Sequence, residues 1–118
     1  MTTDEMKART KTFAHRIIKL VEALPAGRVA DVIGRQLVKS GTSVGANYRA
    51  ACRAKSQADF IAKMGIVEEE ADESAFWLEL IVESGLMKKA LVEDLMSEAN
   101  QLVAIVVSSI NTARGQKR

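Results

Sequence analysis

The chain has 118 residues and a net charge of +2, with 47% hydrophobic residues but only 4% aromatic ones. This length suits one domain, residues 1–118, and excludes two independent domains, while the shortage of aromatic residues favours helices over a sheet. The single cysteine, Cys52, excludes an intramolecular disulfide, and the longest apolar run, residues 102–107, is far shorter than the ~20 residues that span a bilayer.

The first predicted helix covers about residues 4–23. Its core-side residues recur every three or four positions, which is the signature of one helical face: Met6, Thr10, Phe13, Ile17, Leu20 and Leu24. The turn at residues 24–27, which contains Pro25 and Gly27, ends this helix. His15 falls on the opposite face and is expected in water. Because the N-terminal residues lack the apolar stretch of a secretory signal, we expect a cytoplasmic protein.

The second predicted helix covers about residues 28–54, and its residues fall on three lines. The core line holds Ile33, Leu37, Ser40, Val44, Asn47 and Ala51. The opposite line holds Arg35, Lys39, Thr42, Ala46, Arg49 and Arg53. Between them lie Gly34, Val38, Gly41, Gly45 and Cys52. Each glycine costs a helix up to about 1 kcal/mol relative to alanine, so this third line predicts close approach of another helix.

The third predicted helix covers about residues 57–84, between a cap at Ser56 and a terminating Gly85. Its core face holds Phe60, Met64, Val67, Ala71, Ala75, Leu78 and Val82. A second line, formed by Ile66, Trp77 and Leu80, lies well round from that face. Large apolar residues in such a place are either scattered surface residues or half of a subunit contact. The only tryptophan of the chain lies on this line, which favours the contact.

The fourth predicted helix covers about residues 88–112 and has a wide apolar arc. The arc holds Leu91, Val92, Leu95, Met96, Ala99, Leu102, Val103, Val106 and Ile110. Four amphipathic helices joined by short turns predict an all-α, up-down four-helix bundle. In this bundle the helix at 28–54 runs antiparallel beside the helix at 57–84.

Charge is distributed unevenly along the chain. Residues 25–55 carry +5, and residues 56–86 carry −7. A line of cations can follow a phosphate backbone, whose charge dominates nucleic-acid affinity, and we assign this role to Arg35, Lys39, Arg49, Arg53 and Lys55. The alternative is that the arginines pair with carboxylates of the helix at 57–84, within a subunit or across an interface.

Groups for catalysis or metal binding are scarce. A Cys–His pair would need Cys52 beside His15, together with a third group to orient the base. The acidic run at residues 68–73 lacks the histidines that accompany carboxylates in metal-binding bundles. We therefore expect no enzymatic activity, no metal and no other cofactor.

A long motif occupies residues 43–80. It reads Ser43-Val44-x-x-Asn47-Tyr48-Arg49-Ala50-Ala51-x-Arg53-Ala54-Lys55-Ser56-x-x-Asp59-Phe60, then Glu69-Glu70-Ala71-Asp72-Glu73 and Phe76-Trp77-Leu78-Glu79-Leu80. With these residues the chain resembles the bacterial four-helix-bundle proteins of the 23S rRNA intervening sequences, also named S23 ribosomal proteins. The resemblance runs from Phe13 to about Ile110.

The resemblance implies a homopentameric ring without enzymatic activity. The family is similar to the accessory variability proteins of diversity-generating retroelements, which bind nucleic acid and a reverse transcriptase. Many relatives have an acid three residues after the asparagine that matches Asn47, where this chain has Ala50, so no role is carried over to Ala50. We expect Asn47 to hydrogen-bond between helices, because buried amides are nearly always paired.

Two functions remain open. The first is a non-enzymatic homopentamer that binds RNA or other nucleic acid through the basic surface of the helix at 28–54. The second is a scaffold or adaptor for a partner protein, without a nucleic-acid role, which the net charge of only +2 and the acidic helix at 57–84 favour. A small-molecule or metal site in the bundle core is a more distant third possibility.

Overall fold

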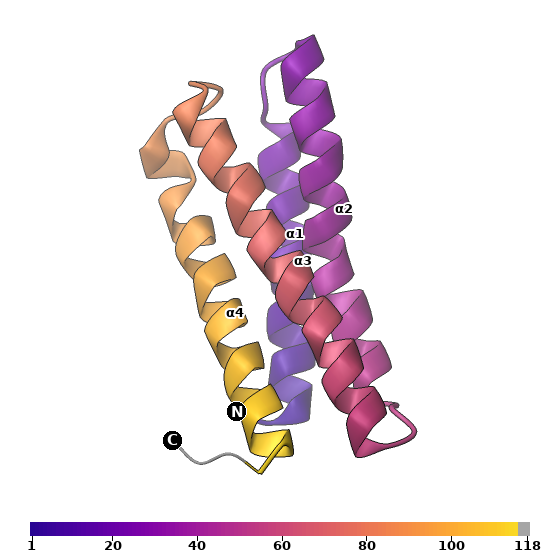
Figure 1. The fold of residues 1–118 in the computed structure, drawn as a ribbon. Coiled ribbons are helices and arrows are strands. Elements are labelled where there is room, and N and C mark those ends of the chain that lie inside the picture. Colours follow the sequence, from indigo (N-terminus) through magenta and orange to yellow (C-terminus); the bar gives the residue numbers. More distant parts are fainter. Residues whose placement is uncertain (116–118) are drawn as a thin grey trace.

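The computed structural model describes residues 1–115 and shows four long helices packed up and down (Figure 1). They are α1 (Thr3–Glu22), α2 (Arg28–Ala51), α3 (Gln57–Glu83) and α4 (Glu93–Ala113), with a 3₁₀ turn, η1 (Lys89–Leu91), before α4. The predicted all-α, up-down bundle is confirmed. Its dimensions of 46 × 26 × 20 Å reflect the length of the helices.

Local sequence signals account for the ends of α1 and α2. The Thr2 side chain accepts a hydrogen bond from the Glu5 backbone N–H, and the Glu5 side chain accepts one from the Thr2 N–H, so a capping box starts α1. Gly27, with φ of 156°, joins the Pro25 turn to α2. The second helix ends at Ala51, three residues earlier than predicted, because the chain then turns through two i to i+3 hydrogen bonds toward Ser56.

Both predicted ends of α3 are confirmed. Ser56 Oγ accepts from the Asp59 N–H at 3.0 Å, while Asp59 reaches back to the Lys55 N–H rather than to Ser56. At the other end Gly85 has φ of 76°. The Leu86 N–H donates to the Ile81 carbonyl and the Gly85 N–H to the Val82 carbonyl, which is the hydrogen-bond pattern of a Schellman motif.

The predicted start of the fourth helix is wrong. The chain leaves Lys88 in an extended conformation, makes the 3₁₀ turn and enters α4 only after Val92. The change of winding leaves Leu91, which we expected in the core, 69% exposed, whereas Val92 is fully buried. A tighter turn rotates side chains by a different angle from an α-helix, so the periodicity of the later residues does not extend back to Leu91.

The predicted close approach of another helix to the glycine line of α2 is confirmed, and that helix is α1. A Cβ atom built on Gly41 would lie 2.8 Å from the Ile17 side chain, and one on Gly45 would lie 3.2 Å from Thr10 Oγ1. Gly34 lies similarly close to Val21. The absence of Cβ atoms therefore sets how near the two helices can come.

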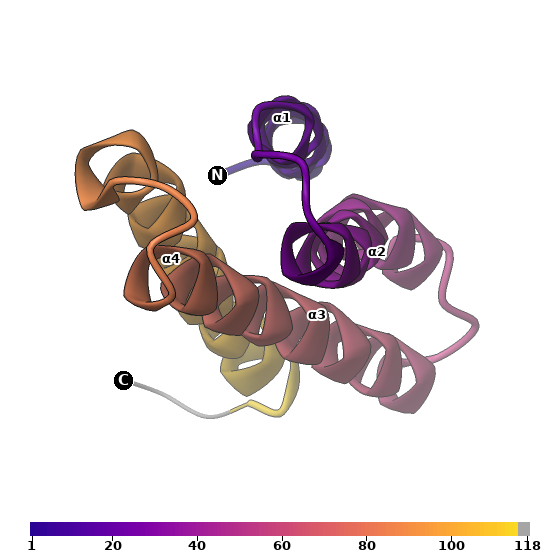
Figure 2. The same cartoon turned by 90° about the horizontal axis from the view of Figure 1, so that it is seen from above.

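The core is shared by all four helices. Among its fully buried side chains are Phe13, Ile17, Leu37, Leu78, Ile81 and Leu102. As Figure 2 shows, α2 lies between α1 and α3, and α4 packs against α3, whereas α1 and α4 touch over a shorter stretch. A buried hydrogen bond of 3.0 Å from Ser74 Oγ to Ser40 Oγ links α3 to α2.

The expected role of Asn47 is wrong. Its side-chain amide donates to the Ser43 carbonyl one turn earlier in α2, at 2.8 Å, so this bond stays within one helix. Tyr48 is buried in its place, whereas Asn47 is half-buried. The core face of α2 is therefore rotated slightly toward α1 relative to the predicted one.

Candidate functional site

The predicted basic residues lie on the outer side of α2 and in the turn that follows it. All five are exposed: Arg35, Lys39 and Arg49 lie on α2, whereas Arg53 and Lys55 lie in the turn beyond its end at Ala51. Along α2 itself, Arg35 and Arg49 are separated by roughly 21 Å at 1.5 Å per residue. We refer to Arg35, Lys39, Arg49, Arg53 and Lys55 as the α2 basic surface.

No cation of the α2 basic surface forms an ion pair within residues 1–115. The ion pairs in that range are Arg9 with Glu98 and Lys63 with Asp59. The expectation that the α2 arginines pair with α3 carboxylates of the same subunit is therefore wrong. The reason is geometric. The core face of α2, which carries Ser40, is turned toward α3, whereas the α2 arginines are exposed on the outer side of the helix.

Two cations of this surface act on carboxylates of α3: the charge of Lys55 helps to lower the pKa of Asp59, and the charge of Lys39 acts on Glu70. Burial raises the pKa of Glu70, and nearby Glu73 raises it further, while a hydrogen bond from Ser43 and the charge of Lys39 oppose the rise. Lys39 thus acts on the electrostatics of α3 without an ion pair. The three arginines of the surface stay available to an external anion.

A groove between α1 and α2 adjoins the α2 basic surface. Its rim carries Lys7 and Lys11 from α1 and Arg49 from α2. The volume of the groove is about 460 Å³. Its floor is built of small residues: Ala8, Thr10, Ala14, Thr42, Gly45 and Ala46. Sequence reasoning missed Lys7 and Lys11, because helical periodicity does not tell which edge of α1 lies beside α2.

The outer face of α3 combines apolar and acidic side chains. Ile66 is 44% exposed and Phe76 is 49% exposed. Trp77 and Leu80 are half-buried, and Trp77 packs against the core. Phe76 packs edge-to-face on Trp77 with ring centroids 5.0 Å apart, and Trp77 Nε1 donates to Glu73 Oε2 at 3.1 Å. The role of Ile66, Trp77 and Leu80 as a subunit contact stays a prediction, and Phe76 joins them.

Cys52 and His15 are not brought together. Cys52 lines a cavity of about 450 Å³ at the end of the bundle where α1 begins, beside Tyr48, whose pKa is raised by burial. His15 is exposed on α1 and does not line this cavity. Within the described part of the chain, no three His, Cys, Asp or Glu side chains are grouped so that they could hold a metal ion.

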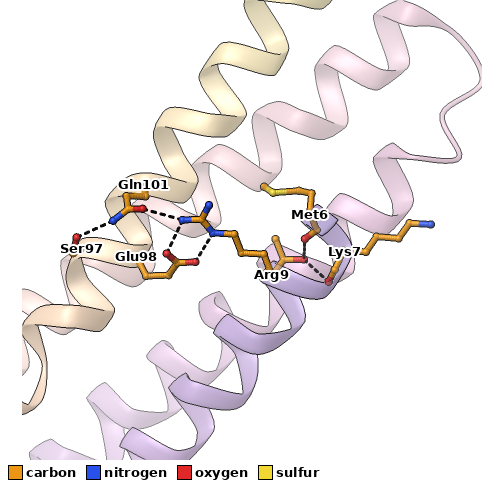
Figure 3. Close-up of polar contacts among 7 residues, drawn as sticks. Met6, Lys7, Arg9, Ser97, Glu98 and Gln101 are labelled. Carbon is orange, nitrogen blue, oxygen red and sulfur yellow. Dashed lines mark hydrogen bonds and ion pairs between the residues drawn. The ribbon is translucent and has the colours of Figure 1, made fainter. Parts of the chain in front are cut away.

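A polar cluster joins α1 to α4, and no sequence pattern singled it out. Arg9 donates from Nε and Nη2 to the two carboxylate oxygens of Glu98, at 2.7 and 2.8 Å, and from Nη2 to Gln101 at 2.9 Å (Figure 3). Gln101 in turn donates to Ser97. Figure 3 also shows Met6 and Lys7, whose carbonyls accept from Thr10 Oγ1. This cluster fastens the pair of helices that share the shorter contact.

Comparison with known proteins places the chain in a family. Residues 4–108 match the family model described as 23S rRNA-intervening sequence protein. A crystal structure from Bacteroides thetaiotaomicron is 35% identical with a TM-score of 0.83, over 88% of this chain and 96% of that one. That protein is described as one of unknown function from the S23 ribosomal protein family.

Neither description names an enzymatic activity. The comparison with curated proteins finds no match. Among residues 1–115, no helix has the length and apolar character needed to cross a membrane. Because the family model covers most of the chain and a relative 35% identical shares its fold, this protein belongs to the 23S rRNA-intervening sequence protein family.

Proposed function

We propose that the protein is a non-enzymatic homopentamer that binds RNA or another nucleic acid through the α2 basic surface. The observation that carries this proposal is the exposure of five cations, none of which forms an ion pair with a described residue. The number of five subunits comes from the family resemblance.

Phosphate is the anion that this surface fits best. Arginine and lysine side chains along one line can each neutralise a phosphate and release its counterions, which makes binding strongly salt-dependent. Tyr48, the aromatic residue within α2, is buried, so it offers no platform on which bases could stack. We therefore expect contact with the backbone of a nucleic acid rather than with its bases.

Assembly would turn a weak site into a strong one. Five cations on one helix and the turn after it bind a phosphate backbone weakly, but several copies held together bind with a high effective concentration. The pentamer and the nucleic-acid contact are thus linked: a monomer with the same surface would bind far less tightly.

The test is fluorescence anisotropy with a structured RNA, a single-stranded DNA and a duplex DNA, at low and physiological salt. We expect binding that weakens steeply with salt and is lost in the double variant Arg35→Glu and Arg53→Glu. The matched control reverses Lys88 and Lys89, two exposed cations at the α3–α4 connection. Circular dichroism should show all variants folded, because the two arginines have no intramolecular ion pair.

Two results would reject nucleic-acid binding. One is the absence of any anisotropy change at low salt. The other is an equal loss of binding in the Lys88 and Lys89 control, which would indicate a response to net charge rather than to the α2 basic surface.

A second candidate function is a scaffold or adaptor for a partner protein. The observation that favours it is the outer face of α3, where Ile66 and Phe76 are exposed beside acidic residues. Purification of the tagged protein from its native cell after nuclease treatment distinguishes the two candidates. A partner protein that is retained in constant stoichiometry supports the adaptor, and its loss with nuclease supports nucleic-acid binding.

A further inference from the structure

The molecule has one basic half and one acidic half. Residues 1–55, which contain α1 and α2, have eleven Lys and Arg against four Asp and Glu, a net charge of +7. Residues 56–118, which contain α3 and α4, have six against eleven, a net charge of −5. Two copies therefore attract each other when the basic half of one meets the acidic half of the other, and they repel when like halves meet.

The outer face of α3 has the composition of a contact surface. We name it the α3 face: Ile66, Glu69, Glu73, Phe76, Trp77 and Leu80. Aromatic residues are enriched at protein interfaces and include many of the side chains that dominate binding energy. On this helix they follow two carboxylates that lie one turn apart. The order along α3 is thus acidic first, then aromatic.

The groove between α1 and α2 has the complementary order. Lys7 and Lys11 lie one turn apart on α1, and they are followed by Ala14 and Ile18 on the same edge of the helix. The floor beside Ala14 consists of Thr42, Gly45 and Ala46 from α2, so a large side chain can enter there. The order along α1 is basic first, then small and apolar.

The two orders match residue for residue when the helices run parallel. Steps of four, three and four residues separate Lys7, Lys11, Ala14 and Ile18, and the same steps separate Glu69, Glu73, Phe76 and Leu80. In this register Lys7 lies opposite Glu69, and Lys11 lies opposite Glu73. Phe76 packs over Ala14 in the groove, and Leu80 contacts Ile18.

From this match we infer that the α3 face of one copy docks in the α1–α2 groove of a second copy, with α3 parallel to α1. In an up-down bundle α1 and α3 run in the same direction (Figure 1). A rotation about an axis parallel to the helices therefore brings the partner's α3 alongside α1 with the required polarity. Such a head-to-tail contact closes into a ring when the rotation closes.

This inference deepens the assembly part of the proposed function, because it names the two surfaces that meet, and it does not depend on nucleic acid. Arg49 belongs to the α2 basic surface and also lines the groove. Arg35 and Arg53 are absent from the groove and remain free for phosphate in the assembly. A face-to-face contact of α3 with α3 is the competing arrangement, and it would bring the carboxylates of two copies together.

The experiment is a charge swap read by sedimentation velocity on nuclease-treated protein. One variant reverses the groove (Lys7→Glu, Lys11→Glu), one reverses the face (Glu69→Lys, Glu73→Lys), and a third carries all four changes. Each double variant should weaken self-association by about 100-fold or more, because like charges then meet. The fourfold variant should recover to within about tenfold of the unmodified protein, because opposite charges meet again.

A further variant, which leaves charge and core unchanged, separates loss of docking from loss of folding. Ala46 is exposed on the groove floor, so Ala46→Trp fills the groove without altering the core or the charge. It should weaken self-association as strongly as the groove reversal while thermal unfolding monitored by circular dichroism stays unchanged.

The possible results separate the proposals. If the unmodified protein is assembled but the groove variants associate normally, the docking inference is overturned and the assembly stands. A fourfold variant that stays dissociated also overturns the docking. If the unmodified protein is a monomer at all concentrations, both the docking and the assembly are overturned. Binding to RNA is then still tested separately, by the anisotropy experiment with the Arg35 and Arg53 variant.

Discussion

Gly41 shows how a single missing atom sets the distance between two helices. A methyl group there would lie 2.8 Å from two carbons of the Ile17 side chain, closer than non-bonded atoms approach. Alanine favours the helix by about 1 kcal/mol over glycine, but overpacking costs about 1 to 3 kcal/mol. We expect Gly41→Ala to lower the free energy of unfolding by about 1 kcal/mol, measured by urea denaturation.

Gly65 supplies the matched control for this substitution. It lies within α3 and has no atom within 4 Å of an added Cβ. Gly65→Ala should therefore raise the free energy of unfolding by up to about 1 kcal/mol. Equal effects of the two substitutions would show that Ile17 moves aside and that the close packing of α1 on α2 does not require glycine.

The Arg9–Glu98 pair is the residue-scale link between α1 and α4. The pair is bidentate and mostly shielded from water, with 27% of the Arg9 side chain and 16% of the Glu98 side chain exposed. Charge-assisted hydrogen bonds of this kind are among the strongest hydrogen bonds in proteins. We expect Glu98→Ala to lower the free energy of unfolding by about 1 to 3 kcal/mol. In a double-mutant cycle with Arg9→Ala, the coupling should exceed that of the Lys63–Asp59 pair, which is more exposed.

At the scale of the element, the start of α3 should respond to acid. A hydrogen bond from the Lys63 ammonium, and then one from the Lys55 N–H, lower the pKa of Asp59 below its ordinary value of 3.8. Because the folded pKa lies below the unfolded one, the stabilisation is present above the unfolded value and is lost as pH falls through the folded value. Asp59→Asn should therefore flatten the acid side of the stability curve, measured by thermal unfolding between about pH 2 and pH 6.

A comparison with Glu5 identifies the contribution of this one helix start. Glu5 also has a lowered pKa, because the backbone and the side chain of Thr2 hydrogen-bond to it. The Asp59→Asn protein should retain the acid response that comes from Glu5. An acid response identical to that of the unmodified protein would mean that Asp59 makes no net contribution.

The helices themselves were readable from the sequence, and the exceptions have local causes. Periodicity placed α1, α3 and the glycine line of α2 correctly, because core contact imposes a regular spacing on each helix. It failed at Leu91, where a 3₁₀ turn interrupts the α-helical period, and at Asn47, whose amide bonds within its own helix. Neither event alters the pattern of apolar residues, so the pattern gives no warning of it.

The candidate surfaces were predicted less completely than the fold. The α2 basic surface was predictable because its residues lie on one helix and in the turn that directly follows it. The groove was not, because Lys7 and Lys11 join it only through the way α1 lies on α2. Phe76 was missed because the sequence does not show which side chains packing leaves exposed, nor that Phe76 packs against Trp77.

For the molecule as a whole, the separation of charge should make self-association depend on salt. Attraction between the +7 and −5 halves weakens as salt screens it, whereas burial of the apolar groups does not. We expect the apparent dissociation constant to rise between about 0.05 and 0.3 M salt and then to level off or fall at higher concentration. Sedimentation equilibrium over this range measures the effect, and a constant that is independent of salt would exclude charge as the basis of association.

The up-down order of the helices also determines where a label can be attached. The bundle has α1 beginning and α4 ending at the same end, while the α1–α2 and α3–α4 connections lie at the other (Figure 1). In a ring whose axis parallels the helices, every tag fused near a chain end would crowd one rim. A fluorophore attached at residues 24–27 or 84–88 would occupy the opposite rim, so the two rims can be distinguished in one labelled particle.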